Sequence, residues 1–189
     1  IEAVEEDVRE AASVLGRLGE LYGLENQSAS NPAKQLAVDL HDRIPVIYGS
    51  EVTAVAALRW KCQINENAKS LAFNHQFPEL NHNEIVGWEF PRSDLERFRV
   101  IYLTDGKLHP QNVKRMDVTA ELLESYVGEI RRYASSGECR LARLLSSINL
   151  GDYVSLYLAV LNGIDPSPVE RIENLKKRSC YNLCLCYYG

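Results

Sequence analysis

Apolar residues recur along the chain with two different periods, and their order predicts helices alternating with strands. Residues 4–21 and 33–41 place apolar side chains on one face at helical spacing. The run I-P-V-I-Y-G at 44–49 is continuously apolar, which is typical of a strand buried on both faces. A further helical pattern begins at Val52 and continues through Cys62 into Q-I-N-E-N-A.

The same alternation continues in the second half of the chain. F-R-V-I-Y-L-T-D at 98–105 and Y-V-G-E-I-R-R-Y-A at 126–134 look like strands, with a helical stretch at 113–123 between them. From Cys139 onward the pattern is helical, and a D-P-S-P-V turn leads into a last short helix that carries Lys176. Strands alternating with helices predict an α/β fold, a three-layer sandwich with a mainly parallel sheet flanked by helices.

Ligand sites in such folds lie beyond the carboxyl ends of the strands. The loops after Tyr48 and Leu103 and the segment 74–84 are therefore the expected walls of a site. The first loop, Y-G-S-E at 48–51, superficially resembles a phosphate cradle. Glu51 argues against a cradle, because a carboxylate in the first helical turn satisfies the helix dipole and would repel a phosphate. We expect a phosphate group to be held elsewhere.

Composition narrows the class of protein. With 46% hydrophobic and 25% charged residues, 189 residues suffice for one sizeable globular core. A net charge of −5 without a basic stripe argues against nucleic acid as a partner. The apolar runs are short, the N-terminal segment is acidic, and five cysteines are an odd number. We expect a cytoplasmic protein with no membrane span and no disulfide framework.

The stretch from Arg59 to Trp88 is the most informative for function, because it sets titratable residues among asparagines just past apolar runs. Glu66 is expected near the C-terminal end of its helix. There the helix dipole and partial burial disfavour a charged carboxylate, which suits a general base. The alternative, which composition alone favours, is a solvated helix face on which Glu66 pairs with Lys69 or Arg59.

His82 lies between Asn81 and Asn83 in a loop that follows Pro78. A loop histidine with polar neighbours is free to exchange protons near neutral pH. Two alternatives stay open: a solvated histidine without a role, and a zinc site that combines His82 with His75 and a nearby glutamate. We expect no metal, because neither H-E-x-x-H nor paired C-x-x-C spacing is present.

Three longer motifs occur in a fixed order: N-E-N-A-K at 65–69, L-N-H-N-E at 80–84 and D-P-S-P-V-E-R-I-E-N-L-K at 165–176. Shorter anchors, such as R-W-K at 59–61, accompany them. From about Ile44 to Lys177 the chain resembles the C-terminal sugar isomerase (SIS) domain of the bifunctional phosphoglucose/phosphomannose isomerases. The order and spacing of the motifs make this resemblance more specific than any one of them.

The resemblance implies an enzyme that converts glucose 6-phosphate and mannose 6-phosphate to fructose 6-phosphate through an enediol. Glu66 would move a proton between C2 and C1. His82 and Lys176, whose own pattern marks it only as an exposed helix lysine, would open the sugar ring. No cofactor or metal is needed, since a positioned carboxylate and hydrogen-bond donors suffice for this proton transfer.

Further residues and partners follow from the same resemblance. Arg59, Asn65 and Asn83 lie in the motifs, and we expect them to bind the hexose 6-phosphate. In the family the histidine reaches into the active site of the neighbouring subunit, so the resemblance implies a homodimer.

One departure from the family is large. Its members carry a first SIS domain with a Gly-rich loop and an S-x-S-G-x-T loop that hold the phosphate, and neither loop occurs here. We therefore expect the C-terminal part of a longer enzyme that lacks its N-terminal SIS domain. Residues 1–43 would be N-terminal helices and linker, 44–178 the C-terminal SIS domain, and 179–189 a Cys-rich tail of unknown role.

Two other functions share parts of this pattern. A sugar-phosphate-binding SIS module of a regulator would have the same fold and need no base. A metal-dependent mannose-phosphate isomerase would need a ligand cluster. The combination of Glu66, His82 and Lys176 favours the metal-free isomerase over both.

Overall fold

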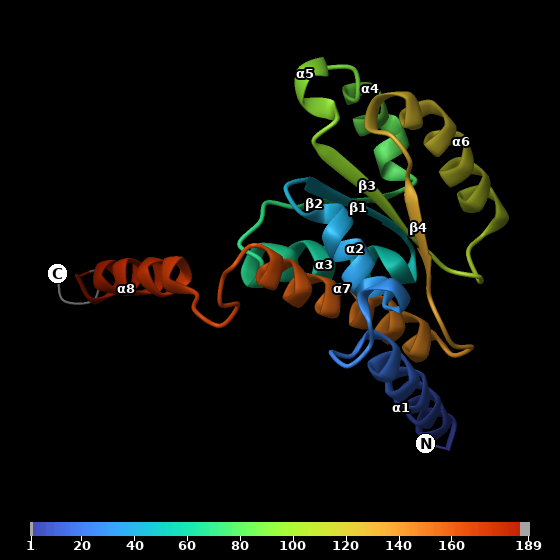
Figure 1. Cartoon of the computed structure of the whole chain (residues 1–189), viewed down its shortest axis with the longest axis horizontal. Helices are drawn as coiled ribbons and strands as arrows, with labels where there is room; N and C mark the ends of the chain where they lie inside the picture. Colours follow the sequence, from blue (N-terminus) through green and yellow to red (C-terminus); the bar gives the residue numbers. More distant parts are fainter. Residues whose placement is uncertain (1, 186–189) are drawn as a thin grey trace.

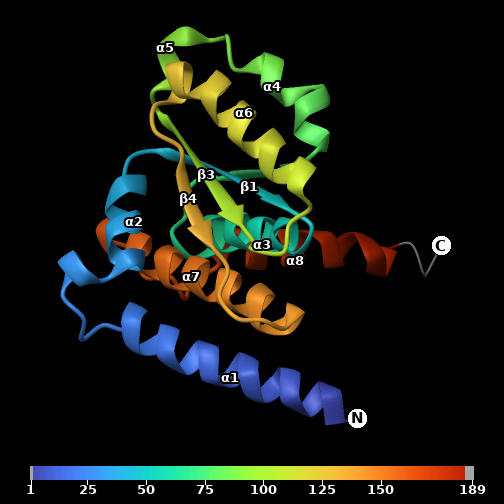
Figure 2. The same cartoon turned by 90° about the vertical axis from the view of Figure 1, so that its right-hand side faces the viewer.

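The protein forms one parallel sheet covered by helices on both faces (Figures 1 and 2). The computed structural model describes residues 2–185, and side chains within residues 2–179. The strands, in the sheet order β2-β1-β3-β4, are β2 (Phe73–Phe77), β1 (Ile44–Ser50), β3 (Phe98–Thr104) and β4 (Arg131–Ala134). The helices are α1 (Glu2–Tyr22), η1 (Ser28–Ser30), α2 (Pro32–Leu40), α3 (Val52–Asn67), η2 (Glu79–His82), α4 (Glu84–Gly87), α5 (Arg92–Leu95), α6 (Pro110–Val127), α7 (Arg140–Leu161) and α8 (Glu170–Leu185).

The continuous apolar runs of β1 and β3 are explained by burial on both faces of the sheet. Successive strand side chains point to opposite faces. Ile47 and Ile101 join the core formed with α2, α3 and α7, whereas Tyr48 and Tyr102 join the core under α4, α5 and α6. The two cores and the sheet between them confirm the predicted three-layer α/β sandwich.

Close packing of α3 against α7 fixes one of these layers. Trp60 is fully buried and donates a hydrogen bond from Nε1 to the carbonyl oxygen of Ser147, 2.7 Å away. A Cβ at Gly151 would come within 2.3 Å of the Trp60 ring, so only glycine permits this approach. The R-W-K motif therefore contributes a core side chain that holds α3 in place.

We expected no membrane span, and among the described residues one helix, α7, is long and apolar enough to cross a membrane by length and composition alone. Half of the most apolar stretch of α7 is buried inside the fold, and α1, α2 and α3 pack around this helix. Its apolar character is accounted for by its place as the central core helix.

Two strands differ from the sequence prediction. Strand β2 has the polar sequence F-N-H-Q-F and lies at the edge of the sheet, where only partial burial is required, so no apolar run indicated it. The strand expected over 126–134 was wrong at its start. Helix α6 continues to Val127, Gly128 then takes a φ of 74°, and β4 covers only Arg131–Ala134.

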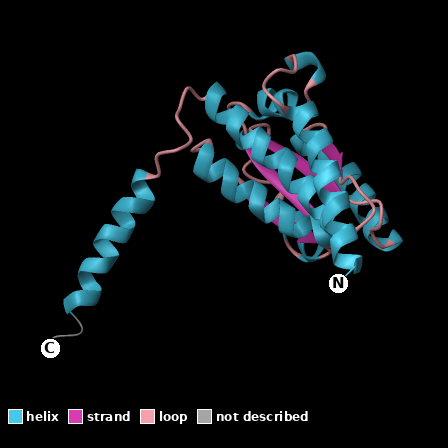
Figure 3. Cartoon of the chain, turned by 90° about the horizontal axis from the view of Figure 1, so that it is seen from below, coloured by secondary structure: helices cyan, strands magenta, loops and turns pink. Residues whose placement is uncertain are grey.

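Helix α8 extends away from the body of the protein (Figure 3). The side chains of residues 170–179 are all exposed, including those of Ile172 and Leu175. Nothing in the described part of the chain covers this helix.

Candidate functional site

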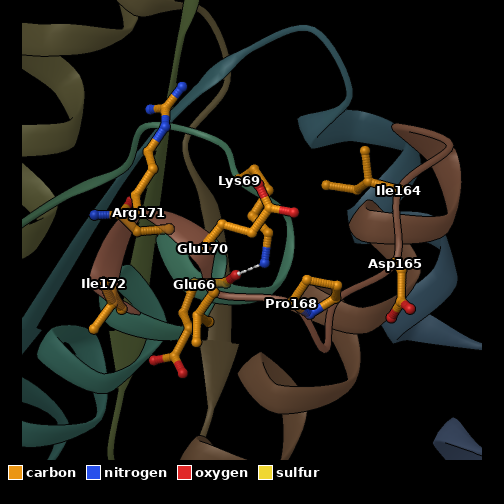
Figure 4. Close-up of a pocket in the computed structure, with 10 residues that line it drawn as sticks. Glu66, Lys69, Ile164, Asp165, Pro168, Glu170, Arg171 and Ile172 are labelled. Atoms are coloured by element: carbon orange, nitrogen blue, oxygen red, sulfur yellow. Dashed lines mark hydrogen bonds between the residues drawn. The ribbon is translucent and has the colours of Figure 1, made fainter. Parts of the chain in front are cut away.

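A cleft of about 530 Å³ lies where the end of α3 meets the linker between α7 and α8 (Figure 4). Asn65, Glu66 and Lys69 form its α3 side. Residues between Ile164 and Ile172 form the other side. The cleft thus contains two of the six predicted site residues.

This cleft lies near the amino ends of the strands, whereas we predicted a site at their carboxyl ends. Helix α3 runs back from the carboxyl end of β1, so its last turn lies beside the start of β2. The hydrogen bond from the Ala72 amide to Asn65 Oδ1, 2.9 Å long, shows this directly. The carboxyl-end rule describes sites at helix N-termini, whereas Glu66 belongs to a helix C-terminus. A smaller hollow of about 420 Å³ lies near Glu51 and His75, on the side of the sheet where we predicted the site.

The asparagines beside Glu66 have structural roles. Asn65 holds the start of β2 through Ala72, as described above. Asn67 donates from Nδ2 to Ser155 Oγ on α7, 2.9 Å away, and so ties the last turn of α3 to the central helix. These two bonds fix the backbone on both sides of Glu66.

The carboxylate of Glu66 remains without a partner among the described residues. Lys69 Nζ donates to the backbone carbonyl of Glu66 at 2.6 Å and to that of Pro166 at 3.1 Å, rather than to the carboxylate. Arg59 is engaged by Asp152, at 3.1 Å, and this hydrogen bond raises the pKa of Arg59 above its ordinary value. The ion pairs of the alternative interpretation are therefore not formed. The exposed Glu66 side chain also lacks the partial burial that we predicted.

The loop that carries His82 is anchored in a similar way. Leu80 is fully buried, and Asn81 Nδ2 donates to Thr119 Oγ1 at 2.8 Å. Asn83 caps the short helix α4 by accepting from the Glu84 amide at 2.6 Å. The imidazole of His82 is exposed and has no hydrogen-bond partner in the part of the chain that the structure describes.

A buried tyrosine connects this loop to the sheet. Tyr48 of β1 donates its hydroxyl hydrogen to the Glu84 carboxylate and accepts a hydrogen bond from Trp88 Nε1 at 3.0 Å. Burial, together with the Glu84 charge, raises the pKa of Tyr48 far above its ordinary value. Tyr48 therefore remains protonated and holds α4 against β1.

Glu66 and His82 lie at opposite ends of β2. Glu66 precedes the strand and His82 follows it, and five residues at about 3.3 Å each give the strand a length of about 16 Å. The cleft around Glu66 does not include His82, Asn83 or Arg59. Within the described residues, one chain does not bring the predicted base and the predicted histidine together.

Lys176 lies on α8, one helical turn beyond Ile172, which lines the cleft. Its side chain is exposed, and it is not among the residues that line the cleft. The three predicted catalytic residues thus occupy three separate elements.

Sequence reasoning missed four charged residues of the cleft. Asp165, Glu170 and Arg171 line it and lie within the D-P-S-P-V-E-R-I-E-N-L-K motif, but that motif was used only for the resemblance and for Lys176. Lys69 was considered only as a partner for the Glu66 carboxylate, although its place after a helix end signalled a role in the turn. The zinc alternative is not assembled, because no three His, Cys, Asp or Glu side chains in the described part of the chain lie close enough to hold a metal ion.

Comparisons with known proteins point to one family. The family model for the bacterial phospho-glucose isomerase C-terminal SIS domain matches residues 29–178. The bifunctional phosphoglucose/phosphomannose isomerase of Caldicellulosiruptor bescii is 46% identical over 94% of this chain and 53% of its own length. The D-glucosamine-6-phosphate 4-epimerase of Sulfolobus acidocaldarius is 41% identical over 77% of this chain and 45% of its own length.

Solved structures agree with the sequence relatives. A glucose-6-phosphate isomerase like protein from Thermus thermophilus has a TM-score of 0.74 and 26% identity, over 86% of this chain and 54% of that one. The chain spans about half the length of the curated relatives that it matches. Because the family model covers well over half of the chain, the chain belongs to the bacterial phospho-glucose isomerase C-terminal SIS domain family.

Proposed function

We propose that this chain is the C-terminal SIS domain of a bifunctional phosphoglucose/phosphomannose isomerase. The complete enzyme would convert glucose 6-phosphate and mannose 6-phosphate to fructose 6-phosphate. One observation carries the proposal: in the turn from Asn65 to Ser70, every polar side chain is hydrogen-bonded within the described structure except Glu66, which faces a cleft.

Glu66 is the general base in this proposal. It takes the proton from C2 of the open-chain aldose and returns it to C1 of the enediol, so that the carbonyl group moves from C1 to C2. The bonds of Asn65 and Asn67 hold the backbone on both sides of the carboxylate without occupying its oxygens. Such fixed geometry is what a proton transfer between adjacent carbons requires.

His82 opens the sugar ring from a second subunit, and the active enzyme is a homodimer. The placement of Glu66 and His82 at opposite ends of β2 supports this arrangement, since a neighbouring copy can present its histidine where this chain has none. Asn83 would accompany His82 as a substrate contact from the same loop. Arg59 could reach the substrate only by releasing Asp152.

The phosphate group is held mainly by the N-terminal half of the enzyme. Within this chain, the start of α3 is occupied by Glu51, whose carboxylate accepts a hydrogen bond from Asn112 at 3.1 Å. A phosphate dianion there would meet a negative charge. We further propose a cytoplasmic location and the division into residues 1–43, 44–178 and 179–189 that the sequence suggested.

Replacement of Glu66 tests the base directly. In the full-length enzyme, Glu66→Gln should lower kcat by about three orders of magnitude or more, because the amide keeps the shape but accepts no proton. Glu89→Gln, at an exposed glutamate without a partner in the described structure, is the matched control and should keep normal turnover. Near-normal turnover of a folded Glu66→Gln enzyme would favour a regulatory sugar-phosphate module. Assays with hexosamine phosphates would reveal a 4-epimerase instead.

Mixing two inactive variants tests the shared site. A dimer of one Glu66→Gln subunit and one His82→Asn subunit keeps one site with both native residues if His82 acts in the neighbouring subunit. Random exchange of equal amounts would then recover about a quarter of the native sites. No recovery after confirmed exchange would place both residues in the same subunit.

A further inference from the structure

Lys69 occupies a backbone position that normally favours glycine. Helix α3 ends at Asn67, Ala68 caps it, and Lys69 follows with a φ of 52°. This left-handed conformation closes many helices, and the residue that adopts it most easily is glycine. A lysine at such a position is disfavoured by its backbone conformation, so the contacts of its side chain are of interest.

The Lys69 ammonium group connects the two walls of the cleft. It donates to the Glu66 carbonyl at the negative end of the α3 dipole and to the Pro166 carbonyl in the linker before α8. The nearby Asp165 carboxylate accepts a hydrogen bond from the Ser167 amide. Hydrogen bonding to Ser167 and the charge of Lys69 lower the pKa of Asp165. One cation therefore joins the turn of the base to the start of the linker; Figure 4 draws its bond to Glu66.

In the described part of the chain, Lys69 alone provides the polar contacts between this linker and the body of the protein. Among the described residues, the Lys69–Pro166 bond is the only hydrogen bond or ion pair between residues 165–179 and the rest of the chain. Helix α8 itself buries none of its described side chains. The direction in which α8 leaves the cleft thus depends on the polar contacts of one lysine.

We propose that Lys69 is a positioning residue that sets the direction of α8, and with it the approach of Lys176 to the cleft of Glu66. It does not act on the substrate itself. The catalytic consequence rests on the isomerase function proposed above, whereas the effect on the linker does not.

Amide exchange in the isolated chain tests the linker without any assay of activity. Lys69→Met should speed exchange of the Ser167 amide, and of the first amides of α8, by about tenfold, because a charge-assisted hydrogen bond is lost. Lys69→Gly should have the same effect while fitting the φ of 52° without strain, so a general loss of folding is separated from the loss of the ammonium. Lys69→Arg should restore most of the protection.

Lys34 provides a matched control. Its ammonium also donates to two backbone carbonyls, those of Leu24 at 2.8 Å and Asn26 at 2.7 Å. These carbonyls belong to another loop, whose residues do not line the cleft. Lys34→Met should leave exchange at Ser167 unchanged. Unchanged exchange in both Lys69→Met and Lys69→Gly would overturn the proposal.

Coupling to Lys176 tests the catalytic part in the full-length enzyme. If Lys69 acts by placing α8, Lys69→Met should reduce turnover of cyclic hexose phosphates by about tenfold, and adding it to Lys176→Met should cause no further loss. Losses that multiply would show that Lys69 acts independently of Lys176, contrary to the proposal. A failed isomerase assignment would appear in the Glu66→Gln experiment and leave the exchange result standing.

Discussion

The turn around Glu66 and the helix α8 border the same cleft, yet they are held in very different ways. Asn65 and Asn67 tie the turn to β2 and α7. Helix α8 is fully exposed over its described side chains and depends on the linker contact of Lys69. The chain therefore fixes the position of the base through several hydrogen bonds, whereas the position of Lys176 depends, in our proposal, on the one linker contact of Lys69.

The loop that carries His82 is held by the fold in the same way as the turn around Glu66. Buried Leu80, Asn81 and the Tyr48–Glu84 pair fix the backbone, while the exposed imidazole of His82 has no partner among the described residues. Two anchored groups thus lie at opposite ends of one strand, and the third predicted group lies on an exposed helix. Substitutions in the hydrogen-bonded turn and the histidine loop should therefore act differently from substitutions on α8.

The largest expected effect comes from the N-terminal half that we propose for the complete enzyme. The isolated chain should bind fructose 6-phosphate weakly and show negligible isomerase activity. Binding energy from the remote phosphate positions C1 and C2 against the base, and this chain offers no phosphate loop. Calorimetry and a coupled assay should show that a longer protein, which includes the N-terminal half, regains both properties.

The control is the folded state of the isolated chain, since its two cores do not involve α8. Cooperative thermal unfolding should persist without the N-terminal half. Full activity from the isolated chain would show that the phosphate is held by residues described above and that α8 needs no outside partner.

A smaller effect is expected from His82, and it should depend on the form of the substrate. His82→Asn should slow turnover of cyclic hexose phosphates by about two orders of magnitude, in the range of a general acid–base contribution. Exchange of the C2 proton in an open-chain analogue should change far less, because ring opening precedes that step. Equal losses in both assays would remove the division of labour between His82 and Glu66.

Much of the fold could be predicted from the sequence because buried strands and packed helices leave periodic apolar patterns. β1, β3 and α3 were predicted from such patterns and are present, whereas the helix around Lys176 was predicted from the turn before it and is longer, at 16 residues, than the short helix expected. The edge strand β2 was missed, because partial exposure lets polar residues such as Asn74 and His75 occupy it. The exposed course of α8 was not predictable either, since periodicity indicates a helix but not what it packs against.

Of the six predicted site residues, only Asn65 and Glu66 line the cleft, and the catalytic roles of all six stay predictions. Glu66 and His82 stand out by their asparagine neighbours, and the structure shows why: those neighbours are anchors. Their location at opposite ends of β2 follows from tertiary geometry that one-dimensional spacing does not contain. Lys69 shows the limit most clearly, because its φ of 52° and its bond to Pro166 relate segments nearly a hundred residues apart.

The smallest expected effect is also the most direct comparison of the two regions. In the isolated chain, Asn67→Ala should lower the free energy of unfolding by about 1–2 kcal/mol, because it removes the half-buried hydrogen bonds to Ser155 and Gln63. Leu175→Ala, at a side chain that is 65% exposed, should change it by less than about 0.5 kcal/mol. Thermal melts would separate the two variants by about 2–6 °C for a chain of this length. In the full-length enzyme the difference in unfolding free energy between the two variants should narrow, because a partner that covers α8 would make Leu175 part of an interface. A Leu175→Ala effect that stays negligible there would show that α8 is exposed in the assembled enzyme as well.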